Sequence, residues 1–288
     1  MVKRAHLITG KGGVGKSLFS LVLAHYFSTQ NQKILLSELS EHSFFKDYLN
    51  LPQISYSPVR FKDNLDICQW SPDDCLKEYC LYLLKIESLY DLFFENPVSK
   101  SLIQVAPGLH ELALLGKMTS SPRRHGPPMN HDQLVIDSFS TGHFLTLLRA
   151  PAALNEAIPF GPMGEQSKGI DACIRNPDFT EVHIVTLPEE LPITESIELF
   201  QQLKKEFNIT PRMYLNKVSG LTSADLIDLS PVAATSFNDI LAAEKNAREE
   251  LAKADISFIE LPLVPSLDVE SIIRTLTTAL TTRLSTAL

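Results

Sequence analysis

A glycine-rich segment near the amino terminus has the residue types and the spacing that bind phosphate groups. It reads Gly10-Lys11-Gly12-Gly13-Val14-Gly15-Lys16-Ser17 and fits the pattern G-x-x-x-x-G-K-[ST]. Glycines allow successive backbone N–H groups to point inward at phosphate oxygens. Lys16 is predicted to neutralise the β- and γ-phosphates, and Ser17 to offer its hydroxyl to Mg²⁺. The sequence therefore predicts a nucleoside triphosphate site with magnesium; the alternative is a glycine turn with no ligand.

The segments around these glycines provide the setting that the pattern needs. An apolar run, Ala5–Thr9, precedes the loop, and an amphipathic run, Leu18–Phe27, follows it. This order predicts a strand, a loop and a helix whose amino terminus adds its positive dipole end to the phosphate site. Another apolar run, Leu134–Asp137, ends in a carboxylate, the arrangement that holds Mg²⁺ in such sites. A strand that ends in an acid also caps many ordinary loops, so this signal is weak by itself.

Lys11 adds a feature that the general pattern lacks. The glycine segment with Lys11 resembles the K-G-G-x-G-K-[ST] loop of the deviant phosphate-loop ATPases. The stretch after Asp137, which contains Thr141-Gly142-His143, resembles the switch II of their arsenite-pump and tail-anchored-protein-targeting branch. This resemblance implies ATP and Mg²⁺ as cofactors, metal binding by Asp137, and a dimer in which Lys11 reaches the partner's phosphates. A homodimer and a heterodimer with a paralogous ATPase stay open, and so does a merely solvated Lys11.

Two later segments extend the resemblance to nearly the whole chain. Asn216 and Lys217 end an apolar run and resemble the strand end whose Asn reads adenine in this family. An amide can donate to one ring nitrogen and accept from the exocyclic amine, so this role suits Asn216. Pro262 and Leu263 resemble the later loop that folds over the base. Without the resemblance, an Asn after a strand is more often a turn residue.

One departure from the family pattern concerns hydrolysis. Where the family carries the Asp that orients the attacking water, ungapped alignment places Ser40, and serine cannot accept a proton as a carboxylate does. Glu38 and Glu41 lie near, and strand alternation predicts Glu38 on the same side as Ser40, which makes Glu38 the better catalytic candidate. We therefore expect slow ATP hydrolysis. The alternative is a regulatory or scaffold protein that senses ATP with little or no turnover.

Short apolar runs alternate along the chain with longer segments of helical period. This alternation predicts an α/β fold, a mostly parallel phosphate-loop NTPase sheet covered by helices on both faces. We expect one domain over residues 1–288, with helices at Thr194–Phe207, Asp239–Ala254 and Val269–Leu288. The predicted strands are Ala5–Thr9, Lys33–Leu36, Leu65–Trp70, Leu134–Asp137, Val182–Thr186, Arg212–Leu215 and Ile256–Leu261.

A helical insertion is expected over residues 71–120. It opens at Ser71-Pro72-Asp73-Asp74, which has a capping serine, proline in the first turn and acids near the positive helix end. Many apolar residues follow between Leu81 and Ile103. Such a segment is either a subdomain buried against the sheet or a groove for a hydrophobic helix of a client protein. The resemblance implies the second use, because the matching segment of the targeting ATPases holds such clients.

Composition excludes several other classes. The net charge of −8 and the pI near 5.5 argue against nucleic-acid binding, and the short basic cluster Arg123-Arg124-His125 is expected to be solvated. The four cysteines form no C-x-x-C pair, so the sequence predicts neither zinc nor redox chemistry at cysteine. We find no signal peptide and no transmembrane run, and expect a cytoplasmic protein. The terminal helix has too few basic residues for membrane-surface binding.

Overall fold

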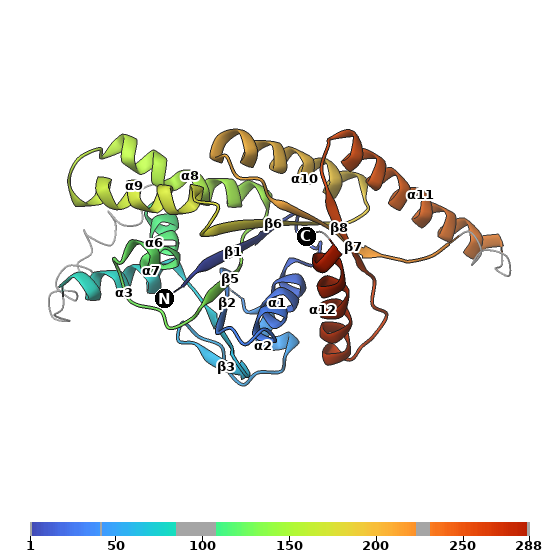
Figure 1. Cartoon of the computed structure of the whole chain (residues 1–288), viewed down its shortest axis with the longest axis horizontal. Helices are drawn as coiled ribbons and strands as arrows, with labels where there is room; N and C mark the ends of the chain where they lie inside the picture. Colours follow the sequence, from blue (N-terminus) through green and yellow to red (C-terminus); the bar gives the residue numbers. More distant parts are fainter. Residues whose placement is uncertain (1, 41, 85–107, 223–230, 287–288) are drawn as a thin grey trace.

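An eight-stranded sheet forms the centre of the protein (Figure 1). The computed structural model describes residues 2–40, 42–84, 108–222 and 231–286. The strand order is β3-β4-β2-β5-β1-β6-β7-β8, and every neighbouring pair is parallel except β3 with β4. The strands are β1 (Arg4–Thr9), β2 (Ile34–Glu38), β3 (Val59–Lys62), β4 (Leu65–Gln69), β5 (Gln133–Asp137), β6 (Thr180–Thr186), β7 (Arg212–Val218) and β8 (Phe258–Pro262).

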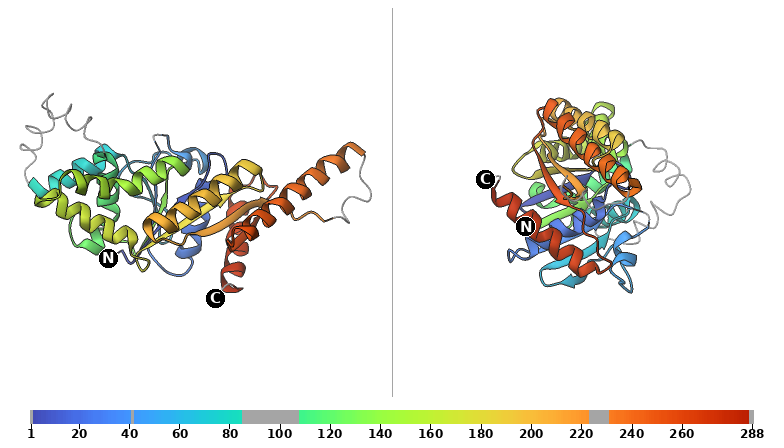
Figure 2. Two further views of the ribbon diagram at one scale, coloured as in Figure 1. Left: turned by 90° about the horizontal axis from the view of Figure 1, so that it is seen from above. Right: turned by 90° about the vertical axis from the view of Figure 1, so that its right-hand side faces the viewer.

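Helices cover both faces of this sheet (Figures 1 and 2). On one face lie α1 (Lys16–Ser28), α2 (Phe44–Tyr48) and α12 (Val269–Thr286). On the other lie α8 (Thr141–Ala157), α9 (Gly161–Arg175), α10 (Glu190–Gln202) and α11 (Pro231–Lys253). The predicted α/β fold, a mostly parallel sheet between helical layers, is confirmed. The alternating apolar side chains of the strands divide the core between the two faces: Leu7 packs in one cluster and Ile8 in the other.

All seven predicted strands are present, but the edge strand β3 was missed. Its sequence, Val-Arg-Phe-Lys, is short and half charged, so no apolar run marks it. It pairs antiparallel with β4 after a tight turn in which Asn64 has a φ of 60°. Its charged side chains suit an exposed edge, where they discourage pairing with other chains.

Two predicted helices have different bounds in the structure. The helix predicted from Asp239 begins eight residues earlier, at Pro231, and the one predicted from Thr194 begins at Glu190. The latter also changes to a π-helical turn, η1 (Leu203–Phe207), before it ends. α11 has a proline at its first position and α10 has Glu190 in its first turn, so the local sequence carried a start signal for each helix.

The described part of the expected helical insertion consists of α3 (Pro72–Leu84), α6 (Leu109–Met118) and the short α7 (Ser120–Arg123). The predicted cap is present: the Asp74 backbone N–H donates to Ser71 Oγ at 3.0 Å. Most of the apolar residues on which the client-groove prediction depends fall in 85–107, outside the described residues. The domain limits and the client groove therefore stay predictions.

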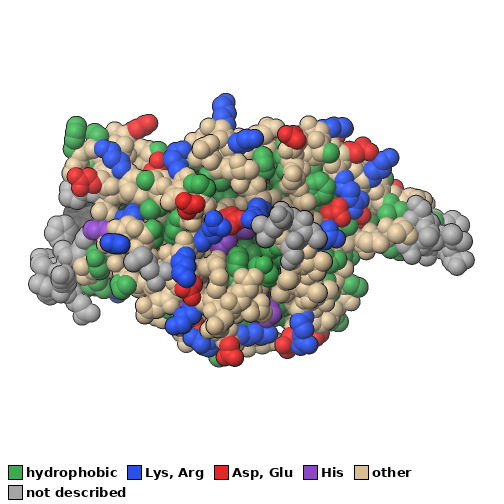
Figure 3. All heavy atoms as spheres, in the orientation of Figure 1, with side chains coloured by type: hydrophobic (Ala, Val, Ile, Leu, Met, Phe, Trp, Pro, Cys, Tyr) green, Lys and Arg blue, Asp and Glu red, His purple; other side chains and the backbone are tan. Residues whose placement is uncertain are grey.

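The cluster Arg123-Arg124-His125 is not simply solvated, contrary to expectation. Arg123 Nη2 donates to the Gly116 carbonyl and its Nε donates to Thr119 Oγ1, both at 2.8 Å. Arg123 thus ties α7 to α6. On the face drawn in Figure 3, acidic and basic side chains are interspersed, with no broad basic area.

Within the described ranges, no helix combines the length and the apolar character needed to cross a bilayer.

Candidate functional site

The predicted nucleotide residues lie at one edge of the sheet. The glycine loop follows β1, Asp137 ends β5, Asn216 lies near the end of β7, and Leu263 follows β8. These strands are parallel neighbours or near neighbours, so their carboxyl ends meet at the same edge. The fold therefore places these groups, which are far apart in sequence, along one crevice.

The glycine loop has backbone angles that other residues rarely adopt. Gly10, Gly13 and Gly15 have φ values of 145°, 83° and 93°. A Cβ atom on Gly10 would lie 2.1 Å from the Val185 carbonyl oxygen, and one on Gly15 would lie 2.6 Å from Asn216 Nδ2. Both the left-handed angles and the tight packing require glycine here. The loop leads directly into α1, whose first turn supplies free N–H groups.

Lys16 is folded back onto this loop. Its Nζ donates to the Lys11 carbonyl oxygen at 2.9 Å, so the ammonium is already directed at the concave side of the turn. Burial lowers the pKa of Lys16, and the Asp137 carboxylate acts in the opposite direction. A partly buried cation beside backbone N–H donors is suited to bind a polyphosphate. A charged phosphate oxygen would then replace the Lys11 carbonyl oxygen as the partner of Lys16.

Asp137 and Ser17 provide the oxygen donors expected of a magnesium site. Asp137 is buried, and Ser20 Oγ donates to its Oδ1 at 3.1 Å. Burial raises the pKa of Asp137, while hydrogen bonds from Ser17 and Ser20 and the charge of Lys16 lower it. A carboxylate and a hydroxyl from adjacent elements form the oxygen-rich donor set that Mg²⁺ prefers. These residues therefore fit the ion that the sequence predicts, and they would hold it beside the glycine loop.

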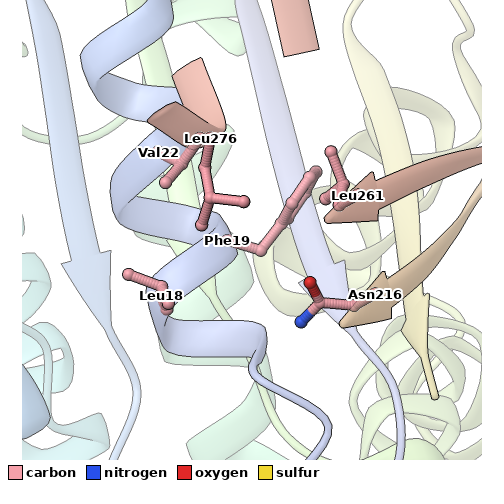
Figure 4. Close-up of a pocket in the computed structure, with 6 residues that line it drawn as sticks. All are labelled: Leu18, Phe19, Val22, Asn216, Leu261 and Leu276. Carbon is pink, nitrogen blue, oxygen red and sulfur yellow. The ribbon is translucent and has the colours of Figure 1, made fainter. Parts of the chain in front are cut away.

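Asn216 contacts the glycine loop directly. Its Nδ2 donates to the Val14 carbonyl oxygen at 2.9 Å, and the residue is 5% exposed. A register shift between β7 and β8 falls at this point, and Lys217 has a φ of 57°. This irregularity turns the Asn216 amide toward α1 (Figure 4). Its adenine-reading role stays a prediction, since the amide nitrogen already bonds to the loop.

Apolar side chains from three elements converge beside Asn216 (Figure 4). They come from α1, β8 and α12, and they are Leu18, Phe19, Val22, Leu261 and Leu276. Pro262 ends β8 and Leu263 follows it. The Leu263 N–H donates to the Val218 carbonyl, although the residue is 50% exposed. An exposed leucine on an anchored loop is available to cover a bound base, as the sequence predicts for this position.

Lys11 has a partner that the sequence reasoning missed. Its Nζ lies 2.7 Å from Glu195 Oε1, and Thr141 Oγ1 donates to Glu195 Oε2 at 3.4 Å. Glu195 belongs to α10 and thus connects the glycine loop with the start of α8. Its separation from Lys11 by 184 positions left no local signal in the sequence.

His143 lies where α8 faces the helical insertion. Its ring stacks on Phe139 with 3.8 Å between centroids, and its Nε2 lies 3.8 Å from Glu111 Oε1 on α6. The predicted switch residues thus touch α10 through Thr141 and α6 through His143. This arrangement gives the nucleotide edge two physical connections to neighbouring helices.

The end of β2 differs from the sequence prediction. β2 ends at Glu38, so strand alternation does not reach Ser40, and the argument that placed the two side chains together was wrong. Ser40 is exposed and its Oγ donates to the His42 carbonyl at 2.8 Å. Glu38 is buried, and its Oε2 accepts from the Phe44 N–H at 3.1 Å.

Glu38 nevertheless lies beside the magnesium candidate. It is the register partner of Asp137 on the neighbouring strand. Burial raises the pKa of Glu38, and its Oε1 has no hydrogen-bond partner among the described residues. Its predicted catalytic role stays untested, but a buried carboxylate with one open oxygen is able to accept a hydrogen bond from water.

Comparisons with known proteins agree with this geometry. A family model described as anion-transporting ATPase matches residues 3–161, more than half of the chain. ATPase BagA of Mycobacterium tuberculosis is 26% identical over 69% of this chain and 61% of its own length. A putative arsenical pump-driving ATPase of Aquifex aeolicus is 24% identical over 68% and 59%. An ATPase ASNA1 homolog of Plasmodium vivax is 24% identical over 69% and 59%. The chain thus spans about three fifths of the length of these relatives.

Proposed function

This chain belongs to the anion-transporting ATPase family, and we propose that it binds and slowly hydrolyses ATP at the carboxyl edge of its sheet. The observation that carries the proposal is the convergence of the strained glycine loop, Lys16 and the buried Asp137 at one point. Backbone N–H groups and Lys16 would bind the phosphates, and Ser17 and Asp137 would hold Mg²⁺. When bound, the ion neutralises charge on the phosphate oxygens.

We propose further that nucleotide state controls a dimer. Lys11 is held by Glu195 within its own chain, at the edge of the sheet, and its side chain is 31% exposed. In a dimer that faces this edge, Lys11 would leave Glu195 for the phosphates bound by the partner. Because Glu195 also contacts Thr141, this exchange would alter the start of α8. The partner is either a second copy of this chain or a paralogous ATPase.

The same switch would reach a client-binding region. His143 follows Thr141 by two residues and approaches Glu111 on α6. A shift of the start of α8 would therefore move the contact between α8 and the helical insertion. We propose that this region holds a hydrophobic helix of a protein client, as the family resemblance implies. The purified protein should then bind an apolar helical peptide in a nucleotide-dependent way, whereas equal binding in every nucleotide state would argue against coupling.

A second function is favoured by the structure of the β2 end. Ser40 points its hydroxyl at the His42 carbonyl, and Glu38 uses one carboxylate oxygen to cap the start of α2, which leaves only its Oε1 to contact water. The alternative is therefore a sensor that binds ATP and dimerises without useful turnover. Such a sensor would use the same phosphate site but would not hydrolyse ATP at a useful rate.

One experiment separates these functions. The mass of the purified chain is measured by light scattering without nucleotide, with ADP and with ATP and Mg²⁺, together with phosphate release. A dimer that forms with ATP and then releases phosphate supports the ATPase switch. Dimerisation without phosphate release supports the sensor, and a monomer in all three conditions contradicts the dimer in both.

A further inference from the structure

A buried group of polar side chains lies away from the nucleotide edge, on the face of the sheet that α1 covers. His6 of β1 pairs in register with Glu181 of β6, and His183 lies two residues further along the same face. His6 Nδ1 is 3.0 Å from His183 Nε2 and 3.5 Å from Glu181 Oε2. The donor atoms of the three residues all lie within 4.8 Å of one another.

From this geometry we propose that His6, Glu181 and His183 form a binding site for a divalent transition metal of the zinc class. Two imidazole nitrogens and one carboxylate oxygen are a donor set that Zn²⁺ accepts, with a fourth position left for water. At metal–ligand distances of about 2.1 Å, tetrahedral ligands lie roughly 3.4 Å apart, close to the observed separations. The role we assign to the ion is structural: it would fasten β1 to β6 beneath α1.

The surroundings of His6 fix which nitrogen is available. Gln133 Nε2 donates to Gln32 Oε1, which leaves Gln133 Oε1 facing His6 Nε2 at 2.6 Å. A carbonyl oxygen can only accept, so His6 Nε2 carries the proton and Nδ1 presents its lone pair to the cluster. Metal-bound histidines usually have such an acceptor on their other nitrogen.

His183 can present its facing nitrogen by a change of tautomer alone. Without an ion, its Nε2–H donates to His6 Nδ1 and the Tyr214 hydroxyl donates to its Nδ1, 3.1 Å away. Because a hydroxyl oxygen also accepts, it can accept a hydrogen bond from an Nδ1–H of His183 once the proton has moved from Nε2 to Nδ1. His183 Nε2 is then free for the metal, and no proton needs to leave the protein. Burial lowers the pKa of both histidines, that of His6 to about 4, so both are neutral near pH 7.

Two arginines near Glu181 carry positive charge that opposes the binding of a metal ion. Their contacts show how the ion could still be accommodated. Arg212 Nε pairs with Glu181 Oε1, and Arg4 Nη1 lies 3.3 Å from Oε2. Arg4 also donates to the Pro177 carbonyl at 3.2 Å, so it has another acceptor when Oε2 turns to the ion. Both side chains are partly exposed, that of Arg212 by 47% and that of Arg4 by 39%, so solvent screens their charge.

One member of the cluster is partly exposed to solvent. Glu181 is 15% exposed, whereas the two histidines are covered. Figure 3 shows histidine, basic and acidic side chains close together near the middle of the drawn face, over β1 and β6. The carboxylate side of the cluster is thus its more exposed side.

The test is metal binding by the full-length chain. Protein freed of metal with a chelator is titrated with ZnCl₂ by calorimetry, and bound zinc is counted by elemental analysis after dialysis. We expect about one zinc per chain and a higher melting temperature with zinc. Glu181→Gln should weaken binding roughly 10- to 100-fold, and His183→Gln should abolish it. Co²⁺ in place of zinc should give the visible absorption of a tetrahedral site, which the variants lose.

A matched control guards against unspecific binding to surface histidines. His131 also contacts a carboxylate, with Nε2 2.9 Å from Asp66 Oδ2, but it lies outside the cluster. His131→Gln should bind zinc as the unchanged chain does. The proposal is overturned if the unchanged chain retains no zinc, or if Glu181→Gln, which alters a partly exposed residue, binds with equal affinity. The Glu181 variant decides the question even where His183→Gln fails to fold.

Discussion

Two regions at the same edge of the sheet differ in how their side chains are arranged. The ends of β1 and β5 carry a strained glycine loop, a lysine directed into it and a buried carboxylate held by serine hydroxyls. The end of β2, directly beside β5, carries an exposed Ser40 and a Glu38 that caps a short helix. In the proposed function, binding and hydrolysis of ATP therefore depend on separate regions, and only the proposed binding region has its side chains directed at one point without a ligand.

Among these predictions, loss of the Lys16 charge in the proposed binding region should have the largest effect. Lys16→Ala removes the cation that faces the predicted phosphates, and charge-assisted hydrogen bonds contribute about 1.5–3 kcal/mol each. We expect ATP to bind at least roughly 10- to 100-fold more weakly, measured by calorimetry with Mg²⁺. Lys205→Ala, which changes an exposed lysine of η1, is the control and should bind normally. Unchanged ATP affinity in Lys16→Ala would place the nucleotide elsewhere.

A carboxylate introduced at position 40, after the end of β2, should raise the rate of ATP hydrolysis. Ser40→Asp supplies the group that the family uses to orient water, and a positioned acid or base contributes roughly 10²–10⁴ in rate. We expect phosphate release to rise about tenfold or more, with little change in ATP affinity. A change in affinity without a change in turnover would show that this loop helps to bind the nucleotide.

Glu38 provides the opposite test at the same strand end. Glu38→Gln should lower turnover much more than Glu41→Gln, because Glu38 is the buried register partner of Asp137. Steady-state phosphate release at saturating ATP measures both variants. Equal small effects would remove Glu38 from the reaction and leave it as a cap of α2.

The buried carboxylate of Asp137 should also affect the free energy of unfolding. Burial raises the pKa of Asp137 above its value in the unfolded chain, so the unfolded state loses this proton first as pH rises. The contribution of Asp137 is then complete below its unfolded pKa and is lost as pH rises through the folded one. Asp137→Asn should therefore stabilise the ligand-free chain near pH 8, by on the order of 1 kcal/mol, while it impairs Mg²⁺ binding.

Urea unfolding at pH 5 and pH 8 measures this effect, and the gain should be smaller at pH 5. Asp171→Asn is a control, because Asp171 is only partly buried and pairs with Arg175 on the same helix, α9. If Asp137→Asn destabilises the chain at both values, the hydrogen bonds from Ser17 and Ser20 outweigh the cost of burying the charge.

The sequence predicted those features whose cause is local. Apolar runs predicted seven strands. The glycine loop could be predicted because few residues other than glycine adopt its backbone angles. Glu195 and the cluster around His6 could not be predicted, since each contact depends on which strands become neighbours. The alternation argument for Glu38 and Ser40 failed because it continued the strand beyond its predicted end at Leu36, and β2 ends at Glu38.

The contact of Lys11 with Glu195 tests the proposed dimer and should give the smallest effect. An ion pair with one-third exposed partners contributes about 0.2–1 kcal/mol, so Glu195→Gln should free Lys11 at little cost to folding. The ATP concentration for half-maximal dimerisation, measured by light scattering, should fall about two- to fivefold. Glu198→Gln, an exposed residue on the same helix, is the control. If Glu195→Gln instead requires more ATP, Glu195 takes part in the assembled dimer rather than holding Lys11 back from it.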